Sequence, residues 1–196
     1  KWYSPSNAFT VNHLPIAPSG PVSGSRCGTG AVSLSVTNPD AGFAIDWYSA
    51  STGGSVLTGG LGTSNFTTPS ISSTTTYYAE TINTLTGCVS SSRTAVSATV
   101  NTIPTITSNT PNSRCGTGTV SLSATASAGT INWYAASTGG VSLGTGTSYT
   151  TPSISATAIY YVDATNNGCT TTARTAITAT VNPFPLASGP ITGTPT

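Results

Sequence analysis

The chain has little charge and few side chains able to perform chemistry. Of its 196 residues, 5% are charged, one is His, four are Cys and none is Met, whereas a typical soluble domain carries about 25% charged residues. A net charge of +1 gives no basic surface for nucleic acid or anionic lipid. No segment approaches the roughly 18 consecutive apolar residues of a membrane-spanning helix. We therefore expect neither nucleic acid as a partner nor membrane insertion.

Small hydroxyl-bearing side chains are abundant instead. Ser and Thr together occupy 69 positions, and 21 more are Gly. The chain still contains 36% hydrophobic residues, and its Val, Ile, Tyr and Trp recur in ordered patterns, so it is not expected to be disordered. Low charge combined with this composition favours a β-rich extracellular protein.

The sequence contains one internal repeat, which is the strongest organisational signal available. The matched segments are RCGTG at 26–30 and 114–118, DWYSASTGG and NWYAASTGG at 46–54 and 132–140, TTPS at 67–70 and 150–153, and RTA at 93–95 and 174–176. The spacing between copies changes only inside Gly-, Ser- and Asn-rich stretches, where loops tolerate length changes. Two homologous modules follow from this.

The repeat predicts the domain organisation. We expect the first module at 20–102, a hinge at 103–105 and the second module at 106–183. Residues 1–19 are interpreted as the tail of a preceding module, and 184–196 as a linker to a following one. The chain is therefore interpreted as a segment of a longer protein.

Within each module the hydrophobic residues alternate with a period of two, which predicts strands rather than helices. Val32, Leu34 and Val36 alternate with serines, and the second copy repeats this alternation. About seven short strands per module, separated by turn signals, are typical of an immunoglobulin-like sandwich. The predicted fold class is therefore all-β, with two tandem immunoglobulin-like β-sandwich modules. Trp47 and Trp133 are expected in the cores.

Charged residues also recur between the copies. Glu80 and Arg93 of the first module correspond to Asp163 and Arg174 of the second. The hairpin between them shortens by two residues, an even change that keeps the strand faces in register. We therefore predict a cross-strand ion pair in each module rather than a catalytic or ligand-binding group.

The four cysteines predict disulfides in an oxidising, exported setting. One bond per module, Cys27 with Cys88 and Cys115 with Cys169, is favoured by symmetry. In the standard sandwich topology, however, those strands begin at opposite ends, and a disulfide needs Cα atoms within about 7 Å. A bond between modules, Cys27 with Cys169, remains the alternative. The spacings do not fit a zinc site.

The sequence offers no catalytic constellation and no cofactor motif. Hydrolase, phosphate-loop, metalloprotease, calcium-loop and dinucleotide signatures are all missing. We expect no catalytic, cofactor-binding or metal site, and no enzyme activity. Tyr48 and Tyr134 follow the core tryptophans and are expected to point outward, since neighbours on a strand alternate. They are the candidate surface contacts.

The order of these motifs resembles the immunoglobulin-like repeat modules of very large surface proteins of Bacteroidota, including gliding-motility adhesins of the SprB type. The resemblance extends from Arg26 to Val181. It implies export by type IX secretion and display on the cell surface, attached to the outer membrane. It also implies neighbouring immunoglobulin-like modules as partners, with surface polysaccharide or the secretion and motility machinery as further candidates. The family carries no catalytic residues.

Two functions are weighed on this basis. The first is a structural and adhesive tandem-repeat segment of a large secreted cell-surface adhesin, whose nearly uncharged surface would behave alike across changes of salt. The alternative is a carbohydrate-binding ancillary module of a secreted polysaccharide-degrading enzyme. That alternative requires a row of exposed aromatic side chains, for which the sequence offers candidates only.

Overall fold

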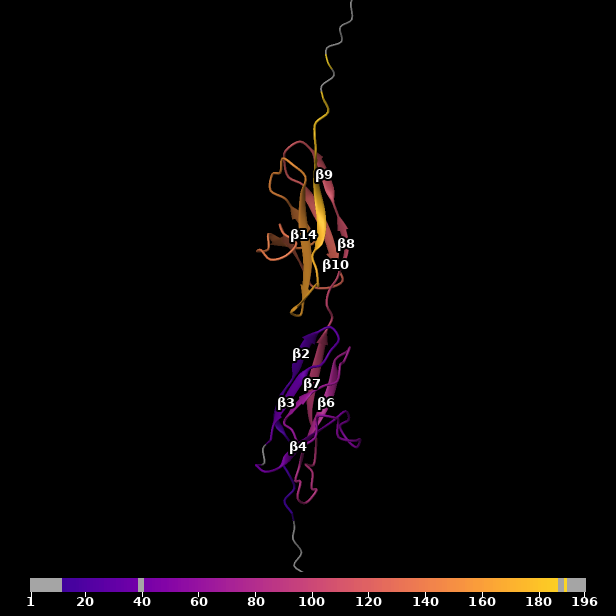
Figure 1. The fold of residues 1–196 in the computed structure, drawn as a ribbon, viewed down its shortest axis with the longest axis vertical. Helices are drawn as coiled ribbons and strands as arrows, with labels where there is room; N and C mark the ends of the chain where they lie inside the picture. Colours follow the sequence, from indigo (N-terminus) through magenta and orange to yellow (C-terminus); the bar gives the residue numbers. More distant parts are fainter. Residues whose placement is uncertain (1–11, 39–40, 187–188, 190–196) are drawn as a thin grey trace, which may run out of the picture. The chain divides into compact units, whose positions relative to one another are not determined.

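The computed structural model describes residues 12–38, 41–186 and 189. The chain divides into two compact units between Asn101 and Thr102, and the described residues of both units form strands and no helix (Figure 1). This confirms the prediction of two tandem all-β sandwiches. Most of the predicted tail at 1–19 and of the predicted linker at 184–196 lies outside the described residues.

The first module is a sandwich of a three-stranded and a four-stranded sheet. Its strands are β1 (Ser19–Val22), β2 (Gly24–Cys27), β3 (Ser33–Thr37), β4 (Ala44–Tyr48), β5 (Asn65–Thr67), β6 (Thr75–Ile82) and β7 (Thr94–Asn101). One sheet has the order β1-β3-β5 and the other β2-β7-β6-β4. Neighbouring strands are antiparallel except β2 and β7, which are parallel.

The second module repeats this plan with additional short strands. Its strands are β8 (Ile106–Thr110), β9 (Asn112–Cys115), β10 (Ser121–Ala126), β11 (Thr130–Tyr134), β12 (Gly144–Thr145), β13 (Ser148–Thr150), β14 (Ala158–Asn166), β15 (Cys169–Thr170) and β16 (Thr175–Asn182). One sheet has the order β13-β10-β8 and the other β12-β11-β14-β16-β9, with β15 paired to β14. Strands β9 and β16 form the parallel pair.

The first strand of each module is interrupted, and its two halves join different sheets. In the first module, β1 pairs with β3 while β2 pairs with β7. Between the halves, the Ser23 hydroxyl accepts a hydrogen bond from the Ser97 backbone N–H at 3.2 Å. In the second module the break falls at Pro111, which has no backbone N–H to donate to a ladder. The interrupted strand ties the two sheets together at one edge.

Each core is built around one tryptophan. Trp47 and Trp133 are both 0% exposed. Trp47 stacks on Phe66 with ring centroids 5.3 Å apart, and Trp133 stacks on Tyr149 at 5.4 Å. Each indole N–H donates to a backbone carbonyl, that of Thr63 at 2.8 Å or of Gly146 at 2.9 Å. The tryptophans therefore fill the cores with their polar atoms satisfied.

Candidate functional site

The most polar constellation of the second module is centred on Arg174. This residue immediately precedes β16, and Asp163 lies on the neighbouring strand β14. Arg174 Nε donates to Asp163 Oδ2 at 3.2 Å. Both side chains are largely buried, with 13% and 7% of their surfaces exposed. The β-ladder thus aligns the two charges, and the surrounding protein screens them less than water would.

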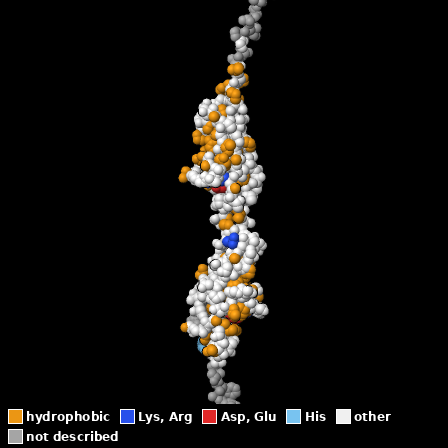
Figure 2. Space-filling view, viewed as in Figure 1, with side chains coloured by type: hydrophobic (Ala, Val, Ile, Leu, Met, Phe, Trp, Pro, Cys, Tyr) orange, Lys and Arg blue, Asp and Glu red, His pale blue; other side chains and the backbone are white. Residues whose placement is uncertain are grey.

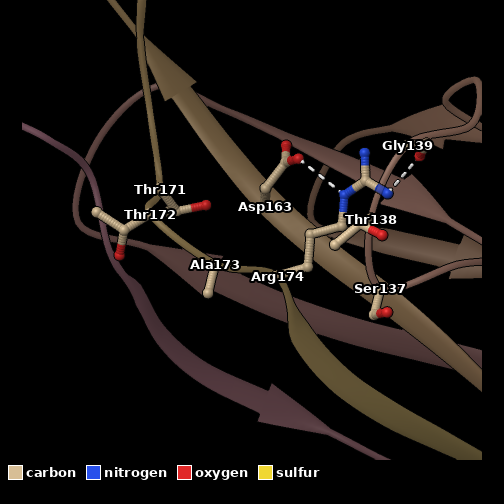
Figure 3. Close-up of a pocket in the computed structure, with 8 residues that line it drawn as sticks. All are labelled: Ser137, Thr138, Gly139, Asp163, Thr171, Thr172, Ala173 and Arg174. Carbon is tan, nitrogen blue, oxygen red and sulfur yellow. Dashed lines mark hydrogen bonds and ion pairs between the residues drawn. The ribbon is translucent and has the colours of Figure 1, made fainter.

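The same guanidinium also holds the loop after β11. Arg174 Nη1 donates to the carbonyl oxygens of Ala136 and Gly139 at 2.8 and 2.7 Å. Figure 3 shows the guanidinium between Asp163 on one side and the Gly139 carbonyl on the other. Gly139 has φ +63°, a conformation that favours glycine. Arg174 therefore fixes the loop to the sheet.

A tyrosine ring completes the group. Arg174 Cζ lies 3.2 Å from the centroid of the Tyr134 ring, close enough for a cation–π interaction. We call Arg174, Asp163, Tyr134 and the two loop carbonyls the arginine clamp of the second module. The fixed, planar fork of arginine donors suits such a multiple contact better than lysine would.

The first module contains the equivalent clamp. Arg93 Nε donates to Glu80 Oε1 at 3.4 Å, and Arg93 Nη1 donates to the carbonyls of Ala50 and Gly53, each at 2.7 Å. Arg93 Cζ lies 3.4 Å from the centroid of the Tyr48 ring. Each predicted ion-pair residue therefore lies beside its predicted partner. The attachment of the loop was not foreseen from the sequence, although the repeated Gly-Gly after each Trp-Tyr was its signal.

A shallow pocket lined mostly by small side chains adjoins each clamp. The pocket of the second module has a volume of about 470 Å³ and is lined by Ser, Thr, Gly and Ala beside Asp163 and Arg174; its Ser137, Thr138, Thr171 and Thr172 hydroxyls are drawn in Figure 3. The pocket of the first module has a volume of about 390 Å³. In both, the carboxylate is paired with arginine. These pockets present hydroxyl groups but no nucleophile paired with a base.

Tyr48 and Tyr134 were expected to be exposed surface contacts, and the structure corrects this. Tyr48 is 8% exposed and Tyr134 is half-buried, because the clamp arginine, which precedes the strand two positions away in the sheet, covers each ring. Each tyrosine directly follows its tryptophan along the strand. An arginine side chain lies over the ring and keeps it from being an open surface. Neither ring is open to stack on a sugar.

The prediction of one disulfide within each module is also corrected. Cys88 and Cys115 are free cysteines, whereas Cys27 and Cys169 are disulfide-bonded. Cys27 lies opposite Asn101 at the end of β7, while Cys88 precedes the start of that strand at Thr94. The intervening seven residues of strand extend about 23 Å, far beyond the roughly 7 Å that a disulfide tolerates.

A second arginine in each module caps a turn. Arg26 Nε donates to the Gly28 carbonyl at 3.1 Å, and Arg26 Nη1 donates to the Ala31 carbonyl at 3.0 Å. Gly30 has φ +153°, and a Cβ there would collide with the Arg26 guanidinium. Arg114 makes the equivalent two bonds in the second module. The repeated Arg-Cys-Gly-Thr-Gly is therefore a turn motif stabilised by its own arginine.

The described residues contain no cluster of His, Cys, Asp and Glu that could hold a metal ion. Within the same residues, no helix is long and apolar enough to cross a membrane. Charged side chains are sparse on the face drawn in Figure 2.

A comparison with protein families identifies both modules. The family described as "Ig-like domain CHU_C associated" matches residues 15–101 and again 102–183. The chain belongs to this CHU_C-associated Ig-like family. The two matched regions correspond to the two sandwiches described above, and both are non-catalytic Ig-like domains, with no catalytic domain identified.

Solved structures place these Ig-like modules among familiar sandwiches. A marsupial T cell receptor shares 13% identity with a TM-score of 0.53, covering 84% of this chain and 73% of that chain. Immunoglobulin domains 1–4 of Sidekick-1 share 18% identity with a TM-score of 0.47, covering 88% of this chain but only 51% of theirs. Fibronectin(III)-like modules of Clostridium thermocellum CbhA share 16% identity with a TM-score of 0.44, covering 86% and 92%. No curated protein matches the chain.

Tyr48, the tyrosine of the first module's clamp, makes the free energy of unfolding of that module depend on pH in the alkaline range. Burial raises the pKa of Tyr48 above its usual value of 10.0, and a hydrogen bond to Glu80 and the charges of Glu80 and Asp46 raise it further, against a smaller opposing effect of Arg93. A raised pKa in the folded state means that the unfolded chain loses this proton first. We therefore expect the free energy of unfolding to fall as pH rises above about 10.

The measurement is urea denaturation of the wild type and of Tyr48→Phe between pH 8 and pH 11. The decline of stability with pH should be smaller in the variant, because one tyrosine with a raised pKa has been removed. If the free energy of unfolding falls equally steeply with pH in the wild type and in Tyr48→Phe, Tyr48 does not contribute to the pH dependence. Burial also raises the pKa values of Tyr77 and Tyr149. These two tyrosines account for the pH dependence of stability that is left in Tyr48→Phe.

Proposed function

We propose that the chain is a structural segment of a large secreted cell-surface adhesin of the gliding-motility type, in which Ig-like modules act as spacers. The observation that carries this proposal is that arginine side chains bind groups of their own module. Arg93 and Arg174 bind carboxylates and loop carbonyls of their own module, and Arg26 caps its own turn. Groups committed to the fold in both copies are not available for a ligand.

An extracellular location is supported by disulfide-bonded cysteines, which persist in oxidising compartments. The uncharged, Ser- and Thr-rich surface suits repeated modules at high local concentration, because it offers little attraction between copies. Display on the outer membrane and export by type IX secretion rest on the sequence resemblance to Bacteroidota surface proteins. Neighbouring Ig-like modules are the partners that this role requires.

The aromatic side chains support the spacer role over carbohydrate binding. Sugar-binding platforms need exposed rings, and among the described aromatic residues only Phe184 is exposed, at 71%. Trp47 and Trp133 are buried, and an arginine covers the ring of Tyr48 and of Tyr134. The described surface thus presents no row of rings.

Two measurements test the proposal. In a pull-down on insoluble cellulose, chitin and xylan, we expect no retention above that of a non-binding control protein. In urea denaturation at low and high NaCl, we expect the free energy of unfolding of each module to change by less than about 0.5 kcal/mol, because buried pairs are weakly screened. Retention that a soluble oligosaccharide competes away would replace the spacer role with carbohydrate binding.

A further inference from the structure

Basic side chains are rare in this chain, and its long loops and its hinge contain none. The loops at 49–64 and 135–143 and the connection at 102–105 have no Lys or Arg. Exposed loops and connections are the usual sites of proteolytic cleavage. The five basic residues of the sequence are Lys1, Arg26, Arg93, Arg114 and Arg174. Lys1 lies outside the described residues, so four arginines remain as positions that a protease specific for basic residues could use.

The two clamp arginines are concealed by their own modules. Only 8% of the Arg93 side chain and 13% of the Arg174 side chain are exposed. Each guanidinium is tied to a carboxylate and to two loop carbonyls, and Figure 3 shows that of Arg174 turned toward Asp163 and Gly139. Proteases of the trypsin class bind the side chain before the cleaved bond in a deep pocket. A clamped guanidinium cannot enter such a pocket.

The peptide bond that follows each clamp arginine is concealed as well. In the first module this bond leads into β7, where Thr94 pairs with Ala79 of β6 and Val96 is 1% exposed in the core. A protease binds its substrate as an extended strand with free backbone groups. The start of β7 would therefore have to leave both the sheet and the core, which amounts to unfolding the module. The bond after Arg174 leads into β16, whose Ile177 is equally buried.

The two turn arginines are held less tightly. Arg26 and Arg114 are half-buried, and each donates to two carbonyls of its own turn. Their strands, β2 and β9, lie at the edge of the larger sheets. Detaching an edge strand is a smaller opening than unfolding a whole module. The turn arginines should therefore be reached before the clamp arginines, although they too are engaged while the module is folded.

We propose that the arginines make each module a substrate of arginine-specific endopeptidases only when that module opens. An intact module conceals both of its arginines, whereas an unfolded module presents two cleavable bonds and the hinge presents none. In the cleavage, water adds across the peptide bond: the arginine carbonyl carbon becomes a carboxylate, and the following nitrogen becomes an ammonium group. A chain with a damaged module is thus cut inside that module. The proposal uses only contacts within modules and does not depend on the spacer role.

The size of the effect follows from the population of the open state. When opening and closing are fast relative to cleavage, the cleavage rate is proportional to the fraction of open molecules. Marginally stable proteins have unfolded fractions of about 10⁻³–10⁻⁶. Cleavage after Arg93 and Arg174 in the folded chain should therefore be at least about 1,000-fold slower than in the unfolded chain.

The first test compares concealed arginines with an exposed basic residue. Trypsin is added to the folded wild type, to Val141→Lys and to Leu85→Lys, and the fragments are reduced and identified by mass over time. Val141 is 84% and Leu85 94% exposed, each in a loop of a different module. We expect both variants to be cut after the new lysine at least about 100-fold faster than the wild type is cut after any of the four arginines. Circular dichroism verifies that both variants are folded.

The second test opens one module at a time. Trp133→Ala removes the central side chain of the second core, while the first module has a separate core. We expect cleavage after Arg174 to become at least about 100-fold faster, and cleavage after Arg93 to change by less than about twofold. Val141→Ala is the matched control, because this exposed side chain contributes nothing to the core, and its cleavage pattern should equal that of the wild type.

Three outcomes would overturn the proposal. The folded wild type could be cut after an arginine as fast as Val141→Lys is cut after its lysine, which would show that the arginines are accessible. Both lysine variants could resist trypsin as the wild type does, so that rigid loops rather than concealed side chains protect the chain. Trp133→Ala could accelerate cleavage equally in both modules, which would separate cleavage from the opening of the module concerned. None of these outcomes bears on the polysaccharide pull-down that tests the spacer role.

Discussion

Trp133→Ala is expected to lower the free energy of unfolding of the second module by about 3–5 kcal/mol. The side chain is 0% exposed, stacks on Tyr149 at 5.4 Å and donates to the Gly146 carbonyl at 2.9 Å. Its removal leaves a cavity in the centre of the sandwich and an unmade hydrogen bond. Small domains have total stabilities of about 5–15 kcal/mol, so the loss is a large fraction of the whole.

Urea denaturation followed by circular dichroism, under reducing conditions, measures this effect. The transition of the second module should move to lower urea, and that of the first should stay in place, because Trp47 belongs to a separate core. Val141→Ala is the matched control, since this side chain of the second module is 84% exposed and should change stability by less than about 0.5 kcal/mol. An equal effect of both substitutions would contradict the assignment of Trp133 to the core.

Arg174→Met is expected to lower the free energy of unfolding of the second module by about 2–4 kcal/mol. The substitution keeps much of the apolar stem but leaves the Asp163 carboxylate, which is 5% exposed, without its cation. It also releases the carbonyls of Ala136 and Gly139 and the contact with Tyr134. Removing one partner of a buried pair is far more destabilising than removing a surface charge.

Arg174→Lys and Arg93→Met are the informative companions. Lysine restores the charge but not the fork of donors, so it should recover only part of the loss. Arg93→Met removes the equivalent clamp and should destabilise the first module while leaving the second unchanged. A loss below about 1 kcal/mol for Arg174→Met, the range of an exposed ion pair, would show that the clamp does not stabilise the loop.

The fold could be predicted from the sequence because its signals are local and repeated. The alternation of Val32, Leu34 and Val36 with serines defines a strand with one buried face, and these three residues are buried in the structure. The recurrence of each charged pair at matching positions indicated cross-strand contacts, and the structure places those groups 3.4 and 3.2 Å apart.

Features set by the path of the chain between strands could not be predicted in the same way. Alternation places Tyr48 on the outward face of the sheet, but the ring is not exposed there because Arg93, which precedes β7, reaches past β6 and covers it. Likewise, the symmetric spacing of the cysteines favours pairing within modules. The standard topology argued against that pairing, and the register of β2 on β7 decides the question by placing Cys27 and Cys88 at opposite ends of the module.

The parallel pairing of the first and last strands has a consequence for a chain held under tension. In each module, β2 or β9 is attached to the preceding chain at its start, and β7 or β16 to the following chain at its end. Pulling on the two attachments slides these parallel strands past each other, so their hydrogen bonds carry the load together instead of opening one by one. Stretching either module by its two chain ends therefore loads these hydrogen bonds in shear.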